Sequence, residues 1–242
     1  MIGILSTIDN PLLPYLLDEI EKKQISPIAL IFDSKTISKK DKLIWERRTG
    51  GVLRPTRETN QELRDRYRKR YKCLFLDSHI SEDAIEQYKI EKISCLLNAG
   101  TPRKISRKVI KNIKQGVLNI HPGKLPEYRG CSCVEWAILN DEQIANSAHL
   151  MSEDYDQGPI IKIETYNFDK KSTYKDIRSQ TYLYSCKLAA ECLYKIKNGE
   201  CNEESLIVQD EQKAKLWKPM PFDLEEKAIK KANDHLYRYQ NK

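Results

Sequence analysis

The sequence predicts an α/β fold with a doubly wound, mainly parallel sheet. In the N-terminal half, short apolar runs alternate with longer segments of helical periodicity. Continuous apolar runs separated by helices are typical of parallel strands whose sheet is covered on both faces. The runs that predict strands are Ile2–Leu5, Ile28–Phe32, Cys73–Leu76, Ile93–Leu97 and Val117–Ile120.

The segments between these strands carry helix signals. Pro11–Lys23 follows Asn10, a residue type favoured at helix N-caps, and places proline at the first helical position. The other helices predicted between strands are Thr59–Arg70, Glu82–Tyr88 and Ile105–Lys114. Strands and helices that alternate in this way indicate a Rossmann-like topology.

The second half of the chain has a different pattern, with a loop rich in proline and glycine at Pro122–Gly130. The elements predicted after this loop are a helix at Val134–Leu139, strand-like runs at Ser147–Met151 and Ile160–Tyr166, and a long helix at Ser172–Ile196. We therefore expect residues 1–197 to form one Rossmann-like domain.

Residues 198–242 are expected to form a C-terminal appendage. Asn198-Gly199 is a turn signal, and Ser205–Val208 and Ala214–Trp217 suggest the two strands of a hairpin. Asp223–Tyr239 has the pattern of a terminal amphipathic helix.

Composition narrows the class of protein. Lys and Arg number 42 against 35 Asp and Glu, and the resulting net charge of +7 favours anionic partners without choosing among them. The N-terminus lacks the basic start and long apolar run of a secretory signal. No apolar stretch has the length of a transmembrane helix. We therefore expect a cytoplasmic protein with no membrane contact.

The cysteine pattern predicts reduced thiols. There are seven cysteines, an odd number, in a chain without an export signal. Cys131 and Cys133 form a C-x-C pair with no second ligand pair at zinc-finger spacing, so we expect no metal site. The role of these two cysteines stays open.

Two common nucleotide-binding classes are disfavoured. The first strand is followed by Ser6–Pro11, a segment without glycine. Neither G-x-G-x-x-G nor G-x-x-x-x-G-K-[ST] occurs in the chain. These absences argue against a dinucleotide-dependent oxidoreductase and against a P-loop NTPase.

Asn119 and His121 are the first candidates for catalysis. They lie two residues apart at the end of a predicted strand, so their side chains share one face. In open α/β sheets, this strand end faces the ligand crevice. An amide and an imidazole together suit acyl transfer, because they can stabilise an oxyanion while the imidazole exchanges a proton.

Asp156 is the third candidate. It lies in a loop between two strand-like runs, where Gly158 permits close approach, and its carboxylate could orient His121 or relay a proton. No Ser, Cys or Lys occupies a nucleophile elbow such as G-x-S-x-G. Direct attack by an acceptor on an acyl donor therefore fits better than a covalent acyl-enzyme. Each residue taken alone has a structural explanation, and the combination favours catalysis.

These residues belong to a set of short motifs. The motifs follow one another in the order Asn119-Ile120-His121-Pro122, Leu125-Pro126, Tyr128-Arg129-Gly130 and Asp156-x-Gly158-Pro159. In this order and spacing the chain resembles the formyltetrahydrofolate-dependent formyltransferase family, and within it most nearly the sugar N-formyltransferases. The resemblance is strong over Ser94–Ile161 and weaker over the rest of the Rossmann-like part.

The resemblance implies roles for particular residues. It implies that Asn119, His121 and Asp156 form the catalytic trio and that the co-substrate is formyltetrahydrofolate, with no metal. It also implies that this donor is held by residues after the fourth strand, namely Leu97, Asn98, Ala99, Gly100 and Arg103. The first four would cradle the pterin through backbone groups, and Arg103 would face the glutamate tail.

The acceptor implied by the resemblance is a nucleotide-linked amino sugar, such as dTDP-4-amino-4,6-dideoxyglucose, used for O-antigen (lipopolysaccharide) or other surface glycans. The glycine-free Ser6–Pro11 argues against a glycinamide ribonucleotide enzyme. The short tail after the catalytic part argues against a methionyl-tRNA enzyme. Both stay open as alternatives.

The same resemblance suggests acceptor contacts and an assembly. We expect Tyr128, Arg129 and Trp217 to contact the acceptor, with Trp217 stacked on the base; ordinary packing of this ring is the alternative. A homodimer through the C-terminal hairpin is also implied.

A basic nucleic-acid-binding protein is the hypothesis from a different class. Basic residues between Arg64 and Lys72 would support it, but a solvated helix face explains them more simply. Such a protein would bind in a salt-sensitive way and would not need the Asn–His–Asp trio. We therefore expect no nucleic-acid partner.

Overall fold

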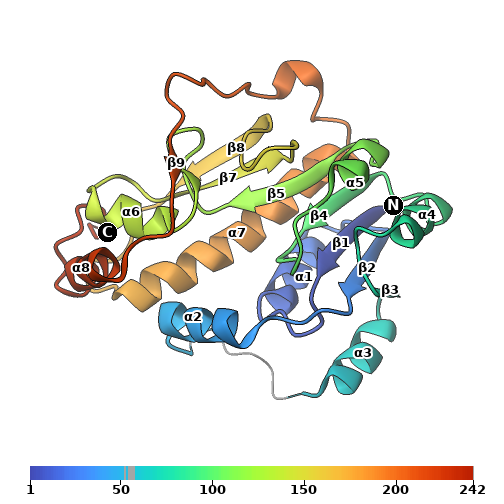
Figure 1. Cartoon of the computed structure of the whole chain (residues 1–242), viewed down its shortest axis with the longest axis horizontal. Coiled ribbons are helices and arrows are strands. Elements are labelled where there is room, and N and C mark those ends of the chain that lie inside the picture. Colours follow the sequence, from blue (N-terminus) through green and yellow to red (C-terminus); the bar gives the residue numbers. More distant parts are fainter. Residues whose placement is uncertain (52, 54–57, 242) are drawn as a thin grey trace.

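The computed structural model describes residues 1–51, 53 and 58–241. Its main sheet has seven strands in the order β3-β2-β1-β4-β5-β7-β8 (Figure 1). The strands are β1 (Ile2–Ser6), β2 (Ile28–Asp33), β3 (Lys72–Leu76), β4 (Cys95–Asn98), β5 (Val117–His121), β7 (Ala145–Leu150) and β8 (Ile160–Thr165). The first five pair in parallel, whereas β7 pairs antiparallel with both of its neighbours, β5 and β8. The predicted Rossmann-like α/β fold is confirmed.

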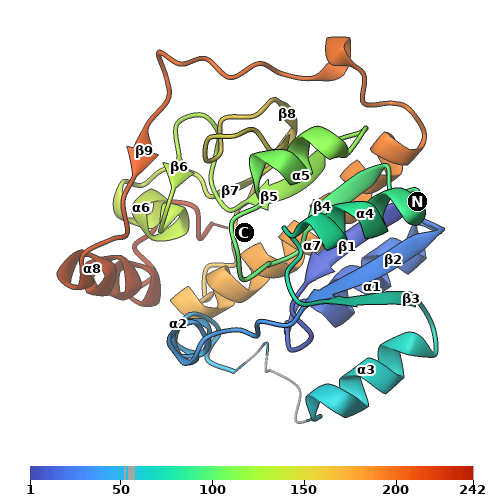
Figure 2. The same cartoon turned by 45° about the vertical axis from the view of Figure 1, so that its right-hand side comes forward.

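Helices cover both faces of this sheet, as the buried strands require (Figures 1 and 2). Those that contribute to one apolar core are α1 (Leu13–Lys22), α3 (Asn60–Arg68) and α7 (Tyr174–Lys197). Those that pack on the opposite face are α4 (Glu82–Ile90) and α5 (Arg107–Asn112). Each of these helices overlaps a predicted one, with ends that differ by a few residues.

The start of α1 differs from the prediction. The helix begins at Leu13, and Asn10 does not cap it. Instead, the side chain of Asn10 accepts a hydrogen bond from the backbone N–H of Leu12 at 2.9 Å and donates one to the carbonyl of Ala99 at 2.7 Å. Asn10 therefore ties the loop after β1 to the loop after β4, which are neighbouring strands.

One helix has no counterpart in the sequence prediction. α2 (Lys39–Thr49) is strongly charged and has no clear apolar face, so its periodicity gives no helix signal. Its ends do carry ordinary signals, because Ser38 accepts a hydrogen bond from the N–H of Asp41 and Gly50 closes the helix with a left-handed φ of 58°.

The predicted C-terminal hairpin is wrong. A short 3₁₀ helix, η1 (Glu203–Ser205), overlaps the first expected strand, and β9 (Leu216–Trp217) pairs in parallel with β6 (Arg129–Gly130). Close pairing needs glycine at position 130, where φ is +94° and a Cβ would overlap the carbonyl oxygen of Trp217. The residues around β9 give no indication that it pairs with a strand so distant in the sequence.

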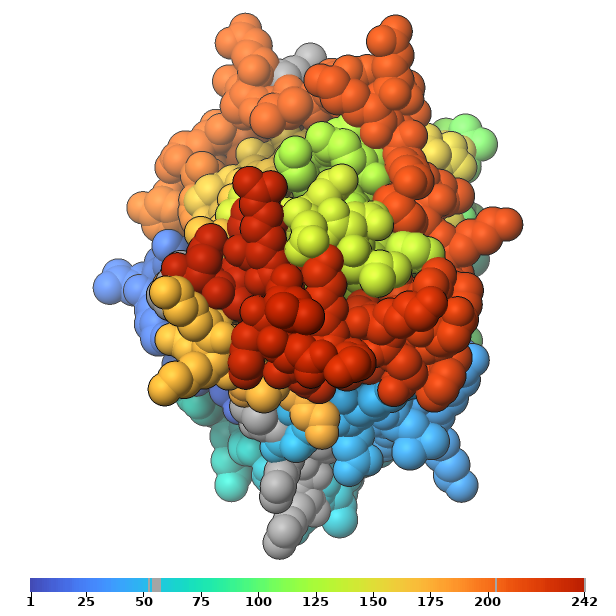
Figure 3. Space-filling view, turned by 90° about the vertical axis from the view of Figure 1, so that its left-hand side faces the viewer, coloured from blue at the N-terminus to red at the C-terminus, as the bar shows by residue number. Residues whose placement is uncertain are grey.

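The end of the chain packs on α6 (Cys133–Leu139) and α7. α8 (Phe222–Asn233) is shorter than the predicted helix and packs against α6, a contact visible in Figure 3 as red atoms against yellow-green ones. Buried residues of both helices and Tyr237 share one core with residues of α7. The division of the chain at residue 197 stays a prediction.

Candidate active site

The candidate site lies where β5 ends beside β7. Asn119 and His121 occupy alternate positions of β5, and Asn119 pairs in register with His149 of β7. The amide nitrogen of Asn119 is 3.1 Å from Nε2 of His149, and its oxygen accepts a hydrogen bond of 2.9 Å from Asn98. The site therefore contains a second histidine that the sequence analysis missed, because alternation within a strand does not reveal the register between two strands.

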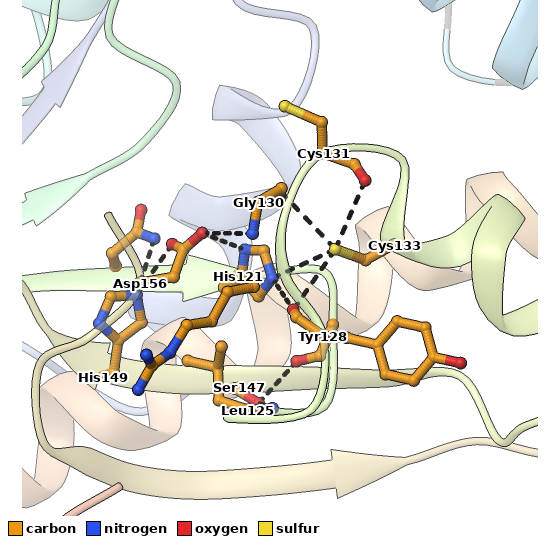
Figure 4. A network of polar contacts seen from close by, with 12 residues as sticks. His121, Leu125, Tyr128, Gly130, Cys131, Cys133, Ser147, His149 and Asp156 are labelled. Atoms are coloured by element: carbon orange, nitrogen blue, oxygen red, sulfur yellow. Dashed lines mark hydrogen bonds and ion pairs between the residues drawn. The ribbon is translucent and has the colours of Figure 1, made fainter. Parts of the chain in front are cut away.

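His121 has a defined proton arrangement. Its Nε2 lies 2.6 Å from the carbonyl oxygen of Tyr128, and its Nδ1 lies 3.4 Å from Oδ2 of Asp156 (Figure 4). A carbonyl oxygen can only accept, so Nε2 carries a hydrogen. In the neutral ring, Nδ1 then holds the lone pair on the side of Asp156.

Asp156 is held in an unusual backbone conformation. Its φ is +57°, in the left-handed region that non-glycine residues seldom adopt. Oδ2 accepts a hydrogen bond of 3.0 Å from the N–H of Gly130, and Oδ1 lies 3.6 Å from Nε2 of His149. Burial opposes ionisation, but His149, His121 and the Gly130 amide together hold the pKa of Asp156 below its ordinary value. The structure thus brings the three predicted catalytic residues together.

The imidazole of His121 is poised to be neutral. Burial lowers its pKa, and the carboxylate of Asp156 and the carbonyl of Tyr128 counteract this only in part. At neutral pH the ring is therefore ready to accept a proton at Nδ1. Once protonated, it is paired with Asp156 and can donate a hydrogen bond.

The titration of His121 tests this arrangement. We expect its imidazole NMR signals to titrate with a midpoint below 6.5. In Asp156→Asn, the midpoint should fall further, since the substitution removes a negative charge that raises the pKa of His121. Asparagine tolerates left-handed φ, so the loop should keep its shape. A midpoint above 6.5 in the wild-type protein, or an upward shift in the variant, would contradict the assignment.

Two clefts meet at Asn98. One has a volume of about 330 Å³, is lined by Asn119, His149 and Asp156 together with loop residues 101–105 and 151–155, and has a polar character. The other, of about 290 Å³, is mostly apolar and runs between α1, Trp45 of α2 and α7. Asn119 lies near the boundary between them, because its side chain accepts a hydrogen bond from Asn98; of the other two predicted catalytic residues, Asp156 lines the polar cleft and His121 lies behind it.

The predicted donor-binding residues are divided between these clefts. Leu97, Ala99 and Gly100 line the apolar cleft, Arg103 lines the polar one, and Asn98 borders both. The guanidinium of Arg103 donates from Nε to the buried carboxylate of Asp33 at 2.9 Å. This ion pair holds the loop after β4 against the end of β2.

The three predicted acceptor contacts lie away from both clefts. Tyr128 is buried and stacks on Trp217 at 5.2 Å between ring centroids, and Trp217 also packs against Trp136. Arg129 is buried and pairs with Gln209 and Glu211. In this structure, neighbouring rings engage Tyr128 and Trp217, and polar side chains engage Arg129. Their role as acceptor contacts stays a prediction.

Cys133, the second residue of the C-x-C pair, is a buried thiol beside His121. The Sγ of Cys133 lies 3.5 Å from Nε2 of His121, and burial raises the pKa of its thiol far above the ordinary value. The thiol stays protonated and packs behind His121, while Cys131 is exposed.

Within the described part of the chain, no three His, Cys, Asp or Glu side chains are grouped so as to hold a metal ion. The helices described there also lack the apolar length of a membrane span.

Comparisons with known proteins agree with this geometry. Residues 34–183 match the family model described as formyl transferase. Methionyl-tRNA formyltransferase of Thermotoga neapolitana is 30% identical over 129 residues, which make up 53% of this chain and 41% of that protein. The match thus spans less than half the length of this curated relative.

Solved structures show the same fold. A sugar N-formyltransferase from a Shewanella species superposes with a TM-score of 0.63 at 14% identity, covering 96% of this chain and 87% of that one. An N-formyltransferase from Helicobacter canadensis, in complex with folinic acid and dTDP-3-aminofucose, superposes with a TM-score of 0.62 at 16% identity, covering 96% and 80%.

Proposed function

The chain belongs to the formyl transferase family, and on that premise we propose that it is a sugar N-formyltransferase. It would move the formyl group of formyltetrahydrofolate to the amine of a nucleotide-linked amino sugar, of the class of dTDP-4-amino-4,6-dideoxyglucose, for a surface glycan such as O-antigen. The observation that carries the proposal is that Asn119 and Asp156 line the polar cleft, with the buried His121 3.4 Å behind Asp156, and that a second, apolar cleft adjoins it at Asn98.

The polar cleft suits the formyl donor. Asn119, His149 and Asp156 line it, and the loop from Thr101 to Ile105 forms part of its wall. A pterin needs hydrogen-bonding partners in its plane, which loop backbone provides. The formyl group would then lie against Asn119 and His121.

The apolar cleft suits the sugar end of the acceptor. Within the described residues no Lys or Arg lines it, and its polar groups are neutral side chains such as Asn10, Asn146 and Ser185. An uncharged deoxyhexose ring fits such a lining, whereas a diphosphate does not. The amino group on the ring would reach the trio past Asn98, with the diphosphate outside the cleft.

The mechanism follows from the positions of the side chains. The neutral amine attacks the formyl carbon, and Asn119 donates a hydrogen bond to the oxyanion that forms. Nδ1 of His121 accepts the amine proton, and Asp156 stabilises the resulting imidazolium. As the bond from the formyl carbon to the donor nitrogen breaks, that nitrogen receives the proton. The products are the N-formyl sugar and tetrahydrofolate.

A panel of acceptors tests the proposal. The protein is incubated with formyltetrahydrofolate and, separately, with dTDP-amino sugars, GDP-amino sugars, glycinamide ribonucleotide and methionyl-tRNA. Mass spectrometry then reports the gain of one formyl group. We expect product only with nucleotide-linked amino sugars. Product with tRNA or glycinamide ribonucleotide alone would replace the proposal with that alternative, and salt-sensitive nucleic-acid binding without any product would favour the non-enzymatic class.

Asp33 gives a second test of the polar cleft. It accepts hydrogen bonds from Arg103 and from the backbone and ring of His79, and so fixes the loop that borders this cleft. Asp33→Asn is expected to raise the KM for the donor about tenfold, with a smaller change in kcat and in the KM for the acceptor. The exposed Asp83→Asn is the control. Unchanged KM values in a folded variant would show that this loop has no role in donor binding.

Location and assembly belong to the proposal as well. We propose a cytoplasmic enzyme that forms a homodimer, and light scattering measures its mass in solution. Because the expected hairpin is replaced by the β6–β9 pairing, a dimer would use another surface of the C-terminal segment.

A further inference from the structure

Gln209, in the C-terminal segment, uses its full hydrogen-bonding capacity next to the catalytic loop. Its Nε2 donates to the carbonyl oxygens of Asp156 at 2.8 Å and of Gly158 at 2.7 Å. Its Oε1 accepts from Nη2 and Nε of Arg129 at 2.8 and 3.0 Å. The carbonyls only accept and the guanidinium only donates, so one orientation of the amide satisfies all four contacts. The residue is buried, which excludes water as a replacement.

The loop that Gln209 contacts needs such support. Asp156 has a left-handed φ of +57°, a conformation that persists in a non-glycine residue only where its surroundings hold it. On its other side the loop presses against β7, where a Cβ at Gly158 would overlap the carbonyl oxygen of Leu150. The loop is therefore clamped between the end of β7 and the amide of Gln209.

The path of the chain explains how Gln209 reaches this loop. Ile207 exchanges two backbone hydrogen bonds with Ile160 at the start of β8, and β9, which begins nine residues later, pairs with β6. Residues 207–217 thus form a strap from β8 to β6, part of the orange-to-red arch in Figure 2. Arg129 of β6 precedes Gly130, whose N–H binds the carboxylate of Asp156.

We propose that Gln209 is a positioning residue for the transfer reaction. Through its amide it holds the backbone of Asp156 so that the carboxylate faces His121 and His149, and Arg129 orients Gln209 from the opposite side. The inference rests on the proposed function, because the group that it positions is the carboxylate assigned to catalysis. It gives Arg129 a role that does not depend on contact with the acceptor.

Two substitutions separate the contacts of Gln209. Gln209→Glu keeps the size and the pairing with Arg129 but sets a carboxylate oxygen against the two carbonyls. Gln209→Leu removes all four contacts. Both are expected to lower kcat about 10- to 100-fold, with KM values little changed, because a displaced catalytic group costs rate more than binding. The exposed Gln212→Glu, three residues away, introduces the same charge without these contacts and should match the wild-type kcat.

An NMR readout follows the same proteins without relying on activity. The imidazole signals of His121 and His149 should shift in both Gln209 variants and stay in place in Gln212→Glu, whereas a merely structural role would lower thermal stability without moving them. A folded Gln209→Glu with wild-type kcat and unchanged imidazole signals overturns the inference.

If the wild-type protein transfers formyl to no acceptor, the proposed function fails. The imidazole signals then test by themselves whether Gln209 positions the loop of Asp156. If Gln209→Leu does not fold, Gln209→Asn, one methylene shorter, replaces it. A smaller loss of kcat with the same shifts supports the inference, and a wild-type kcat with wild-type signals rejects it.

Discussion

Asn119→Ala is expected to lower kcat about 10²–10³-fold, the usual cost of removing one oxyanion donor. The amide of Asn119 is fixed on two sides, since its oxygen accepts from Asn98 and its nitrogen faces His149. Its second N–H is free to meet the oxyanion at the start of the polar cleft. Single-turnover rates measured with saturating donor and acceptor would report the chemical step itself.

The matched control is Asn112→Ala, an exposed asparagine on α5. It should leave kcat unchanged. His121→Ala and Asp156→Ala should each remove most turnover as well, and double variants should be little worse than single ones because the three groups act as a unit. Near-normal turnover in a folded Asn119→Ala protein would exclude the amide from the mechanism.

Strands β1, β2 and β4 were predictable because they are covered on both faces and therefore read as nearly continuous apolar runs. The placement of Asn119 and His121 on one side of β5 follows from alternation alone. The role of His149 was not predictable, since its position opposite Asn119 depends on the register between two antiparallel strands. Sequence alternation fixes faces within a strand, whereas neighbours across strands are set by the tertiary fold.

The errors have a common origin in the C-terminal segment. The apolar residues of β9 suggest a local hairpin, but they pair with β6, more than 80 residues earlier. Gln209 similarly acts on a loop around Asp156, which no short-range pattern links to it. Long-range pairing of two-residue strands leaves almost no periodicity to detect.

Glu135→Gln is expected to lower the free energy of unfolding by about 3–5 kcal/mol, which is the usual cost of removing one partner of a buried ion pair. Glu135, on α6, is fully buried, with Nε of Arg178 at 3.4 Å and the hydroxyl of Tyr174 donating at 2.7 Å. Arg48 of α2 also lies within ion-pair distance. The carboxylate thus joins α6 to α2 and α7.

The pH dependence of this loss has a definite sign. Burial opposes ionisation of Glu135, but Arg178 and Arg48 outweigh it and hold the pKa of the carboxyl below the ordinary 4.5. Its contribution to stability is therefore complete above that value and is lost as the pH falls through the lowered pKa. The stability difference between the wild-type protein and Glu135→Gln should be largest near neutral pH and should narrow in acid.

Chemical denaturation at several pH values measures this difference. A double variant separates the effect of the charge from that of side-chain packing. Glu135→Gln leaves the buried Arg178 without a countercharge, so adding Arg178→Met should recover part of the lost stability, because no unpaired charge then stays buried. Arg48, which is partly exposed, can turn to water and needs no replacement. If the double variant were less stable than Glu135→Gln, or if the loss were equal at all pH values, the stabilisation would come from the shape of the side chains and not from the charge of Glu135.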